Sequence, residues 1–351
     1  MKLTDIEKKE YDRYFSYYDF SKEFRDKTFL ITGSKGVVGQ AVIKWLLNYN
    51  KLYNANIKII ASTRNHNKIP MYIENNDKIE FCQFGKEKEY CKDKKINYII
   101  HCATPTDRDA YTNTPYETLQ VIINGTNDMI SICKEQKLVE NNCIMVYVSS
   151  EEVYGTVCSK EKVDENFIGS IDSLNTRSCY PLGKKTSELM CNIAIKEYDV
   201  DIRIIRPTVI MGLFQKYEWD RVENEILRCI VENKNLVMKT KGLTKKSVVY
   251  SLDVASAIFI ILLKGKSSGV YNVTNESSFD TVSNTAEKMF KRFNNKCKVV
   301  YANEQGDSTN SYLGQRELLL DTKNICELNW KAYTSFEDIY RIDIERFKKN
   351  E

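Results

Sequence analysis

Two adjacent carboxylates stand where an apolar segment of the chain ends. The run 143–148, CIMVYV, is followed by Ser149 and Ser150 and then by Glu151 and Glu152. A short apolar run of this kind is typical of a buried strand. Carboxyl groups at the end of a strand can act as acid and base in a reaction. The alternative is that both are solvated loop residues.

A glycine-rich loop lies near the start of the chain. The segment TFLITGSKGVVG has the spacing G-x-x-G-x-x-G, directly after a predicted strand and at the start of a predicted helix. Glycine there permits a tight turn and a close approach of backbone N–H groups to a pyrophosphate. The helix N-terminus adds partial positive charge. The motif predicts dinucleotide binding by Gly33, Ser34, Lys35, Gly36, Val37, Val38 and Gly39.

The residues after the second predicted strand bear on the kind of nicotinamide cofactor. This strand, 57–61, is followed by Ser62, Thr63, Arg64 and Asn65, with no acidic residue to hold a ribose 2′-hydroxyl. Arg64 could instead meet a 2′-phosphate, which favours NADP slightly over NAD. Alternatively, Arg64 stacks on the adenine or faces solvent.

A tyrosine and a lysine stand four residues apart in the segment RSCYPLGKK. On a helix, positions i and i+4 lie on one face, so the Tyr180 phenol and the Lys184 ammonium can point to the same site. A free phenol has a pKa of about 10 and is a weak base at neutral pH. A nearby ammonium and an oxidised nicotinamide favour the phenolate, so we expect a lowered pKa for Tyr180.

The order of the predicted elements explains how these residues meet. From residue 27, short apolar strands alternate with helices, which predicts an α/β fold: a Rossmann-type, doubly wound parallel sheet with helices on both faces. The predicted strands are 28–32, 57–61, 79–83, 98–103, 143–149 and 201–206, and the predicted helices include 37–49, 115–135 and 182–197. After Pro207 the alternation weakens. There we expect helices at 220–233, 252–264 and 281–294 and strands at 236–239, 246–251 and 270–273.

These elements suggest three parts. Residues 1–26 are predicted to form an N-terminal helical extension. Residues 27–206 are predicted to form the dinucleotide-binding domain, to which 247–264 returns. Residues 207–246 and 265–351 are predicted to form a smaller C-terminal α+β lobe that binds substrate.

The composition narrows the classes of function. The 351 residues carry a net charge of only +4, which argues against nucleic acid or an acidic membrane as partner. No apolar run is long enough to cross a membrane, and the charged N-terminus lacks a signal-peptide core, so we expect a cytoplasmic protein. Eleven cysteines without a C-x-x-C pair favour reduced thiols. Two histidines leave little room for a zinc site or a Ser-His-Asp triad, and we expect no metal.

Together the motifs resemble the extended short-chain dehydrogenase/reductases, the family of nucleotide-sugar epimerases, 4,6-dehydratases and decarboxylases. The matching segments are TGSKGVVG, HCATP (101–105), NGT (124–126), SSEEVYG, YPLGK and RP (206–207). The segments PYETL and RSCYxxGK are especially similar to UDP-glucuronate decarboxylases. The resemblance implies a nucleotide-sugar substrate, an NAD(P) that stays tightly bound and is recycled, and a homodimer.

The resemblance also implies roles for single residues. Tyr180 would be the base, Lys184 its electrostatic partner, and Ser150 the donor that positions the sugar C4 hydroxyl. The ketone formed at C4 would acidify the proton at C5. Further implied contacts with the cofactor come from Ala103, Thr104 and Arg206, and contacts with the substrate from Pro105, Val209 and Lys246 as well as Ser150 and Glu152.

The pair Glu151 and Glu152 bears on the choice of reaction. In 4,6-dehydratases these two positions carry an acid that protonates the departing C6 hydroxyl and a base that removes the C5 proton, which favours a 4,6-dehydratase. Neighbours on an extended strand point to opposite faces, so both reach one site only if the backbone turns. If only Glu152 faces the substrate, an epimerase or decarboxylase is favoured. A net NADPH-dependent reductase and a non-catalytic NAD(P)-binding protein are further alternatives.

Two departures from the family pattern lie in the substrate lobe. The chain has Val209-Ile-Met-Gly212 where many relatives have Asn before an aromatic-Gly-Pro turn. It has Lys246 where they often have Arg. Lysine can meet a diphosphate only as a point charge, a change that counts mildly against a decarboxylase.

Overall fold

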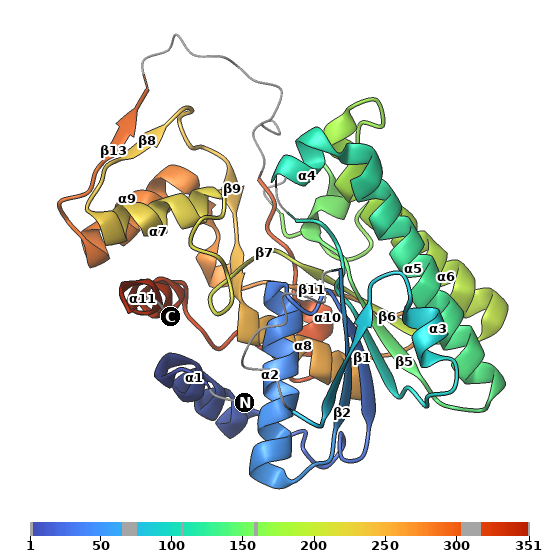
Figure 1. Cartoon of the computed structure of the whole chain (residues 1–351). Coiled ribbons are helices and arrows are strands. Elements are labelled where there is room, and N and C mark those ends of the chain that lie inside the picture. The colour runs from blue at the N-terminus through green and yellow to red at the C-terminus, as the bar shows by residue number, and fades with distance from the viewer. Residues whose placement is uncertain (1–2, 65–75, 107, 158–160, 303–316, 350–351) are drawn as a thin grey trace.

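The computed structural model of the chain describes residues 3–64, 76–106, 108–157, 161–302 and 317–349 (Figure 1). A seven-stranded parallel sheet forms its centre, in the order β11-β6-β5-β4-β1-β2-β3. This confirms the predicted Rossmann-type fold. The strands are β1 (Thr28–Thr32), β2 (Lys58–Thr63), β3 (Ile79–Gln83), β4 (Tyr98–His101), β5 (Ile144–Val148), β6 (Asp201–Pro207) and β11 (Val270–Val273).

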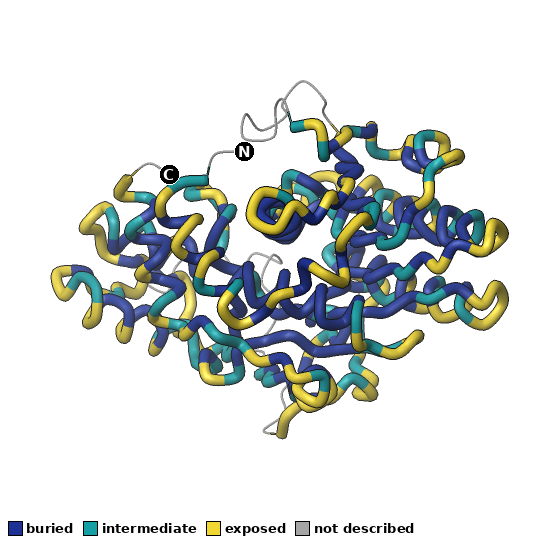
Figure 2. The backbone as a smooth tube through the Cα atoms, turned by 90° about the horizontal axis from the view of Figure 1, so that it is seen from below, coloured by how far each residue is buried: buried dark blue, intermediate teal, exposed yellow. Residues whose placement is uncertain are grey.

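Helices cover both faces of the sheet because successive residues of its central strands β1, β4 and β5 are mostly apolar and buried. Phe29 and Ile31 of β1 pack into the larger hydrophobic core, whereas Leu30 packs into a second core on the opposite face. The larger core lies under α2 (Val37–Tyr53) and α8 (Ser251–Lys264), and the second under α5 (Pro115–Leu138) and α6 (Cys179–Tyr198). Buried backbone accordingly runs through the middle of the molecule, with exposed segments at its outer ends (Figure 2).

The last strand of the sheet comes from the part of the chain that we assigned to the substrate lobe. β11 pairs in parallel with β6, with Val270 opposite Ile204. The central sheet therefore extends beyond residue 265, where we expected the lobe to resume. The division into domains remains a prediction, with this strand as an exception to its boundaries.

Smaller elements surround the carboxyl ends of the strands. β7 (Val209–Met211) pairs in parallel with β10 (Val248–Tyr250). The remaining strands are β8 (Leu236–Met238), β9 (Lys245–Lys246), β12 (Asp280–Thr281) and β13 (Val299–Tyr301). The remaining helices are α3 (Glu87–Cys91), α4 (Arg108–Asn113), α7 (Val222–Glu232), α9 (Val282–Phe293), α10 (Lys323–Cys326) and α11 (Phe336–Lys348), with 3₁₀ turns η2 (Glu151–Tyr154), η3 (Thr176–Ser178) and η4 (Glu276–Ser278).

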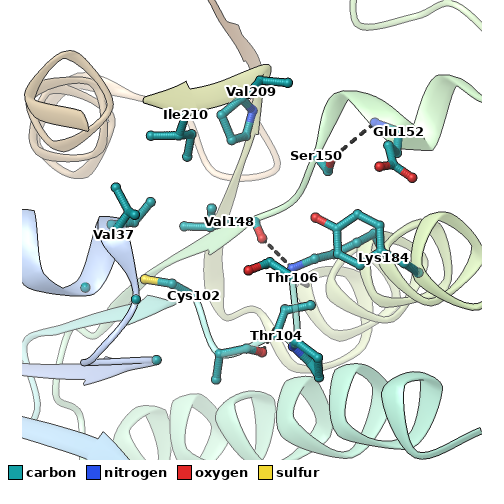
Figure 3. A pocket seen from close by; sticks show the side chains of 18 of the residues that line it. Val37, Cys102, Thr104, Thr106, Val148, Ser150, Glu152, Lys184, Val209 and Ile210 are labelled. Atoms are coloured by element: carbon teal, nitrogen blue, oxygen red, sulfur yellow. Dashed lines mark hydrogen bonds between the residues drawn. The ribbon is translucent and has the colours of Figure 1, made fainter. Parts of the chain in front are cut away.

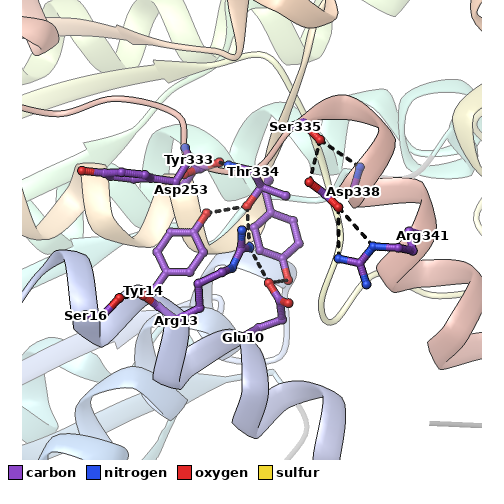
Figure 4. A network of polar contacts seen from close by, with 11 residues as sticks. Glu10, Arg13, Tyr14, Ser16, Asp253, Tyr333, Thr334, Ser335, Asp338 and Arg341 are labelled. Atoms are coloured by element: carbon purple, nitrogen blue, oxygen red, sulfur yellow. Dashed lines mark hydrogen bonds and ion pairs between the residues drawn. The ribbon is translucent and has the colours of Figure 1, made fainter.

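The N-terminal extension forms one helix, α1 (Asp5–Tyr17), that begins with a capping box between Thr4 and Glu7. This helix and α8 together hold the segment before α11 in place. The Tyr14 hydroxyl lies 2.7 Å from Thr334 Oγ1, and the Tyr333 N–H donates to the buried Asp253 carboxylate at 2.8 Å (Figure 4). No helix within the described ranges is both long and apolar enough to cross a bilayer.

Candidate active site

The carboxyl ends of the central strands open into one cavity of about 920 Å³. β1 pairs with both β2 and β4, so the chain order reverses beside β1. In open parallel sheets this crevice is the usual ligand site. The cavity is lined by all the predicted catalytic residues: Ser150, Glu151, Glu152, Tyr180 and Lys184. Figure 3 labels Ser150, Glu152 and Lys184 around it.

The glycine loop forms one wall of the cavity and leaves no room for side chains. Gly33 has a φ of +67°, and a Cβ there would lie 2.9 Å from the backbone nitrogen of Ala103. A Cβ at Gly39 would overlap the carbonyl oxygen of Gly33 and lie 2.9 Å from the Cα of Ser34. The loop is therefore tightly packed between β1, β4 and α2, as the motif predicts.

The N-terminus of α2 offers donors to this wall. Its N-cap is Gly36, and no side chain caps the helix, so the first backbone N–H groups have no side-chain acceptor. Such groups, together with the helix dipole, bind phosphate oxygens. All seven predicted loop residues line the cavity, as do Ala103 and Thr104 at the end of β4. This cradle fits the pyrophosphate of a dinucleotide.

Beside the end of β2 lies a carboxylate, that of Glu87, which the sequence analysis did not single out. Arg64 is exposed and lines the cavity together with Ser62. The buried Glu87 accepts hydrogen bonds from Ser62 Oγ at 2.5 Å and from the Gly85 N–H at 2.7 Å. Both oxygens of Glu87 are therefore engaged within the protein. Asn65 lies outside the described residues.

Tyr180 and Lys184 lie on the first turns of α6, one turn apart, and both are buried. Lys184 Nζ donates to the carbonyl oxygen of Val148 at 2.7 Å (Figure 3) and lies 5.9 Å from the centre of the Tyr180 ring. Burial lowers the pKa of Lys184 to about 7. The strand end of β5 thus fixes the ammonium on the side of α6 that faces the cavity.

The protein alone, without the nicotinamide that our expectation included, shifts the pKa of Tyr180 upward. Burial, reinforced by the negative charge of Glu152, raises the pKa of Tyr180 to about 12. A hydrogen bond from Ser150 and the charges of Arg221 and Arg177 act in the lowering direction but are outweighed. Our prediction of a lowered pKa included an oxidised nicotinamide beside the phenol and stays a prediction for that state. It did not count the cost of placing a phenolate in a buried position.

The backbone turns at the glutamate pair. Ser150 is the N-cap of η2, and its Oγ accepts the Glu152 N–H at 3.1 Å. Because the chain leaves the extended conformation at Glu151, neighbouring side chains need not point to opposite faces. Both Glu151, which is buried, and Glu152 line the cavity. A turn of the backbone at this point is the condition under which both carboxylates can act in one site, and the structure meets it.

Two residues near the glutamates were not selected from the sequence. Arg177 NH2 lies 3.2 Å from each carboxylate oxygen of Glu152. Its guanidinium lies 4.4 Å from the centre of the Tyr111 ring, which lies 5.0 Å from that of Tyr180. Both line the cavity. Arg177 stands three residues before Tyr180 in the chain, and this spacing was the only available signal.

The predicted substrate contacts fall into two groups. Pro105 and Val209 line the cavity, Val209 from β7 (Figure 3). Lys246 also lines it, but its Nζ lies 2.5 Å from a carboxylate oxygen of the buried Glu223. The lysine that we expected to meet a diphosphate therefore already has an anionic partner.

Arg206 does not join the site. It is not among the residues that line the cavity, and its guanidinium forms a two-armed ion pair with Glu188 at 2.6 and 2.9 Å. It also donates to the Tyr154 hydroxyl at 2.9 Å. Its predicted contact with the cofactor has no support in this placement. Among the described residues, no group of His, Cys, Asp and Glu side chains is arranged to hold a metal ion.

Relatives of known activity match at low identity. The chain is 23% identical over 340 residues to the human dTDP-D-glucose 4,6-dehydratase, covering 92% of this chain and 91% of that protein. It is 24% identical over 188 residues to UDP-glucuronic acid decarboxylase 3 of Arabidopsis thaliana, covering 54% of this chain and 53% of the relative.

Solved structures share the fold. The dTDP-glucose 4,6-dehydratase of Bacillus anthracis, in complex with NAD, superposes with a TM-score of 0.73 at 17% identity, covering 92% of this chain and 97% of that one. The UDP-glucose 4-epimerase of Thermotoga maritima, with UDP-glucose, gives a TM-score of 0.75 at 19% identity, covering 92% and 99%. The model of the NAD dependent epimerase/dehydratase family matches residues 29–274, and the chain belongs to this family.

Proposed function

We propose that the protein modifies a nucleotide-activated sugar through a transient ketone at C4, with NAD(P) bound and recycled, and that the overall reaction is 4,6-dehydration. The observation that carries the proposal is that Glu151 and Glu152 both line the cavity that contains Ser150, Tyr180 and Lys184. Two carboxyl groups beside a Tyr/Lys pair supply an acid and a base in addition to the base for the C4 hydroxyl.

The cofactor end of the site is the wall made by the glycine loop and the start of α2. These groups would hold the pyrophosphate, and Arg64 at the end of β2 lies where it could meet the adenosine ribose. When bound, the nicotinamide supplies the hydride acceptor for C4 and later the hydride donor for C6.

At C4, Tyr180 takes the hydroxyl proton while Ser150 orients the hydroxyl by a hydrogen bond. The phenol needs an added positive charge to act as a base, because burial holds its pKa at about 12 in the protein alone. Lys184, held by the Val148 carbonyl, lies 5.9 Å from the centre of the Tyr180 ring. Its ammonium form favours the phenolate.

At C5 and C6, the two glutamates act on opposite ends of one bond. Glu152 accepts the C5 proton, which the C4 ketone has acidified. Glu151 gives a proton to the C6 hydroxyl, which leaves as water. A hydride then returns to C6 and a proton to C5, so the product is a 4-keto-6-deoxy sugar and the net change is the loss of one water.

The test is product analysis with dTDP-glucose and UDP-glucose. Dehydration predicts a product lighter by one water, with a C4 ketone, and no net consumption of cofactor. A product that keeps its C6 hydroxyl and is inverted at C4 or C5 would show an epimerase instead. Carbon dioxide released from UDP-glucuronate would show a decarboxylase, and stoichiometric loss of NADPH a net reductase.

The Tyr180→Phe variant tests whether the protein is an enzyme that uses Tyr180 or a non-catalytic protein that only binds the cofactor. We expect its turnover to fall by roughly 10²–10⁴, with cofactor binding retained. Unchanged turnover would show that Tyr180 is not the base. No turnover of any of these sugars by the wild type would favour the non-catalytic alternative.

We propose three further properties. A preference for NADP would come from Arg64, which is exposed and lines the cavity. The Arg64→Ala variant should then weaken NADP⁺ binding more than NAD⁺ binding.

A homodimer would use the outer faces of α5 and α6, where Leu138, Leu189 and Ile193 are exposed. The Leu189→Glu variant should then be a monomer by light scattering. A cytoplasmic location would suit the cysteines, because those within the described ranges are free thiols.

A further inference from the structure

Arg177 is held in a defined position just ahead of the helix that carries Tyr180. It lies in η3, whose N-cap Asn175 accepts the Arg177 N–H with its side chain at 2.9 Å. The turn brings the guanidinium from the start of α6 across to η2, where NH2 lies 3.2 Å from both oxygens of Glu152. The two side chains are 20% and 22% exposed, so the pair is largely shielded from water.

The other side of the guanidinium rests on an aromatic ring. Its central carbon lies 4.4 Å from the centre of the Tyr111 ring, a distance at which a cation is attracted to the π face. Tyr111 in turn packs at 5.0 Å against Tyr180. Arg177 thus fills the space between the carboxylate of η2 and the aromatic pair beside the phenol.

Glu152 is fixed at both of its ends. Its backbone N–H donates to Ser150 Oγ at 3.1 Å, and its carboxylate is paired with Arg177. Ser150 also hydrogen bonds to Tyr180. The five residues Ser150, Glu152, Arg177, Tyr111 and Tyr180 therefore form a closed ring of contacts along one wall of the cavity. A base held in this way needs no reorientation at the moment of proton transfer.

We propose that Arg177 is a positioning residue for the second half of the reaction: it holds the Glu152 carboxylate in the orientation that accepts the C5 proton. This inference rests on the proposed function, in which C4 is oxidised first and C5 is deprotonated next. Arg177 acts through Glu152 and does not touch the reacting atoms. The first step depends directly on Tyr180 and Ser150; Glu152 and Arg177 reach it only through their opposite electrostatic effects on the pKa of Tyr180.

The alternative role for Arg177 is to bind the sugar itself. Its NH1 is buried and has no hydrogen-bond partner among the described residues. If NH1 binds the substrate, loss of the guanidinium raises KM. If Arg177 positions Glu152, loss of the guanidinium lowers kcat and leaves KM nearly unchanged.

The experiment measures the two steps, oxidation at C4 and deprotonation at C5, separately in the Arg177→Met and Arg177→Lys variants. The substrate is dTDP-glucose or UDP-glucose, whichever the wild type converts. The near-ultraviolet absorbance of reduced nicotinamide reports the first step in a single turnover, and solvent deuterium at C5 reports the second. For Arg177→Met we expect the first step to stay within about threefold of the wild type and C5 exchange to fall roughly 10- to 100-fold. Reduced cofactor then accumulates, and Arg177→Lys recovers part of the exchange.

Arg203→Met is the matched control. Like Arg177, Arg203 is an arginine paired with a carboxylate, that of Asp201 at 2.7 Å, but Arg203 is buried and is not among the residues that line the cavity. We expect this variant to lower thermal stability without changing the ratio of the two steps. If Arg177→Met fails to fold, Arg177→Lys carries the same comparison, because it keeps the charge but cannot hold the guanidinium geometry.

The positioning role is overturned if both steps slow by the same factor, if neither slows, or if only KM rises. These outcomes leave the proposed function standing as long as the wild type exchanges C5 with solvent and Tyr180→Phe is inactive. A wild type that makes product without exchange or proton transfer at C5 would instead overturn the proposed function together with this role. A crystal structure of Arg177→Met with Glu152 turned away from the cavity would support positioning independently of turnover.

Discussion

The ammonium of Lys246 lies 2.5 Å from a carboxylate oxygen of Glu223 at the wall of the cavity. Glu223 is buried, and although burial alone would raise its pKa, the pairing with Lys246 holds the pKa below its usual value. A nucleotide diphosphate that approaches Lys246 therefore meets a charge that is already balanced. The sequence suggested Lys246 as a contact for a diphosphate but did not show that it has an anionic partner.

Removing the carboxylate of Glu223 should tighten the binding of the nucleotide-sugar substrate. In Glu223→Gln, Lys246 keeps its charge and loses its competing anion, so we expect KM for the nucleotide sugar to fall severalfold, with a stronger dependence on salt. Steady-state kinetics at low and high salt measure this. Glu225→Gln, an exposed change on the same helix, is the control and should leave KM unchanged. A higher KM in Glu223→Gln would mean that the carboxylate itself contacts the substrate.

The two glutamates should fail at different steps. Glu152→Gln removes the base, so we expect solvent exchange at C5 to fall roughly 10²–10⁴-fold while oxidation at C4 persists. Glu151→Gln removes the acid, so C5 exchange should continue while loss of water stops. Deuterium content and product mass distinguish the two. Equal loss of C5 exchange in both variants would contradict the separate roles.

Binding of oxidised cofactor should lower the pKa of Tyr180. Burial holds this pKa at about 12 in the protein alone. The positive nicotinamide of NAD⁺ favours the phenolate, whereas the neutral ring of NADH does not. The measurement is the tyrosinate absorbance of the wild type minus that of Tyr180→Phe during alkaline titration. We expect a shift to lower pH with NAD⁺ and none with NADH; an equal shift with both would point to a conformational cause.

A methyl group at Gly39 should disturb the glycine loop, the part of the cavity wall that is proposed to bind the cofactor. In Gly39→Ala the Cβ would overlap the Gly33 carbonyl, a backbone atom that cannot give way easily. We expect NAD⁺ and NADP⁺ affinity to fall by at least about tenfold, because the loop must shift to relieve the clash. Gly36→Ala is the milder comparison, since its Cβ would lie 3.2 Å from the same carbonyl oxygen. Isothermal titration measures both, and equal affinities in the two variants would contradict this account of the loop.

Asp253 should make folding stability fall as the pH rises toward neutrality. Burial raises its pKa from 3.8 to about 7 despite hydrogen bonds from the Tyr333 and Thr334 N–H groups (Figure 4). Between these two values the folded state binds more protons than the unfolded state, so the contribution is full below pH 3.8 and is lost as pH rises through about 7.

The measurement is the free energy of urea unfolding for the wild type minus that for Asp253→Asn. This difference should decrease between pH 5 and pH 8, an interval of roughly three pH units in which the linkage amounts to a few kcal/mol at most. Asp338→Asn is the control: the pKa of Asp338 is lowered and its side chain is 43% exposed, so its difference should not change over this interval. A flat difference for Asp253→Asn would show that the carboxylate is already ionised at pH 5.

The sequence alone determined the parts of the fold that depend on neighbours in the chain. Apolar runs such as 28–32 alternate with amphipathic helices, and this periodicity depends only on local geometry and burial. The glycine spacing and the Tyr180/Lys184 spacing are likewise local, and both features lie at the predicted site. The strand 270–273 was predicted as a strand, but its place beside β6 was not.

Only the tertiary structure decided which charged groups meet. Arg206 pairs with Glu188, Lys246 with Glu223, and Arg177 with Glu152, over sequence separations of 18, 23 and 25 residues. Burial removes competing water from such groups, so the partner that packing places nearby decides what each charge can do. The sequence contains these residues but not the packing that joins them. For the same reason the sequence predicted the place of Tyr180 but not the burial that raises its pKa in the protein alone.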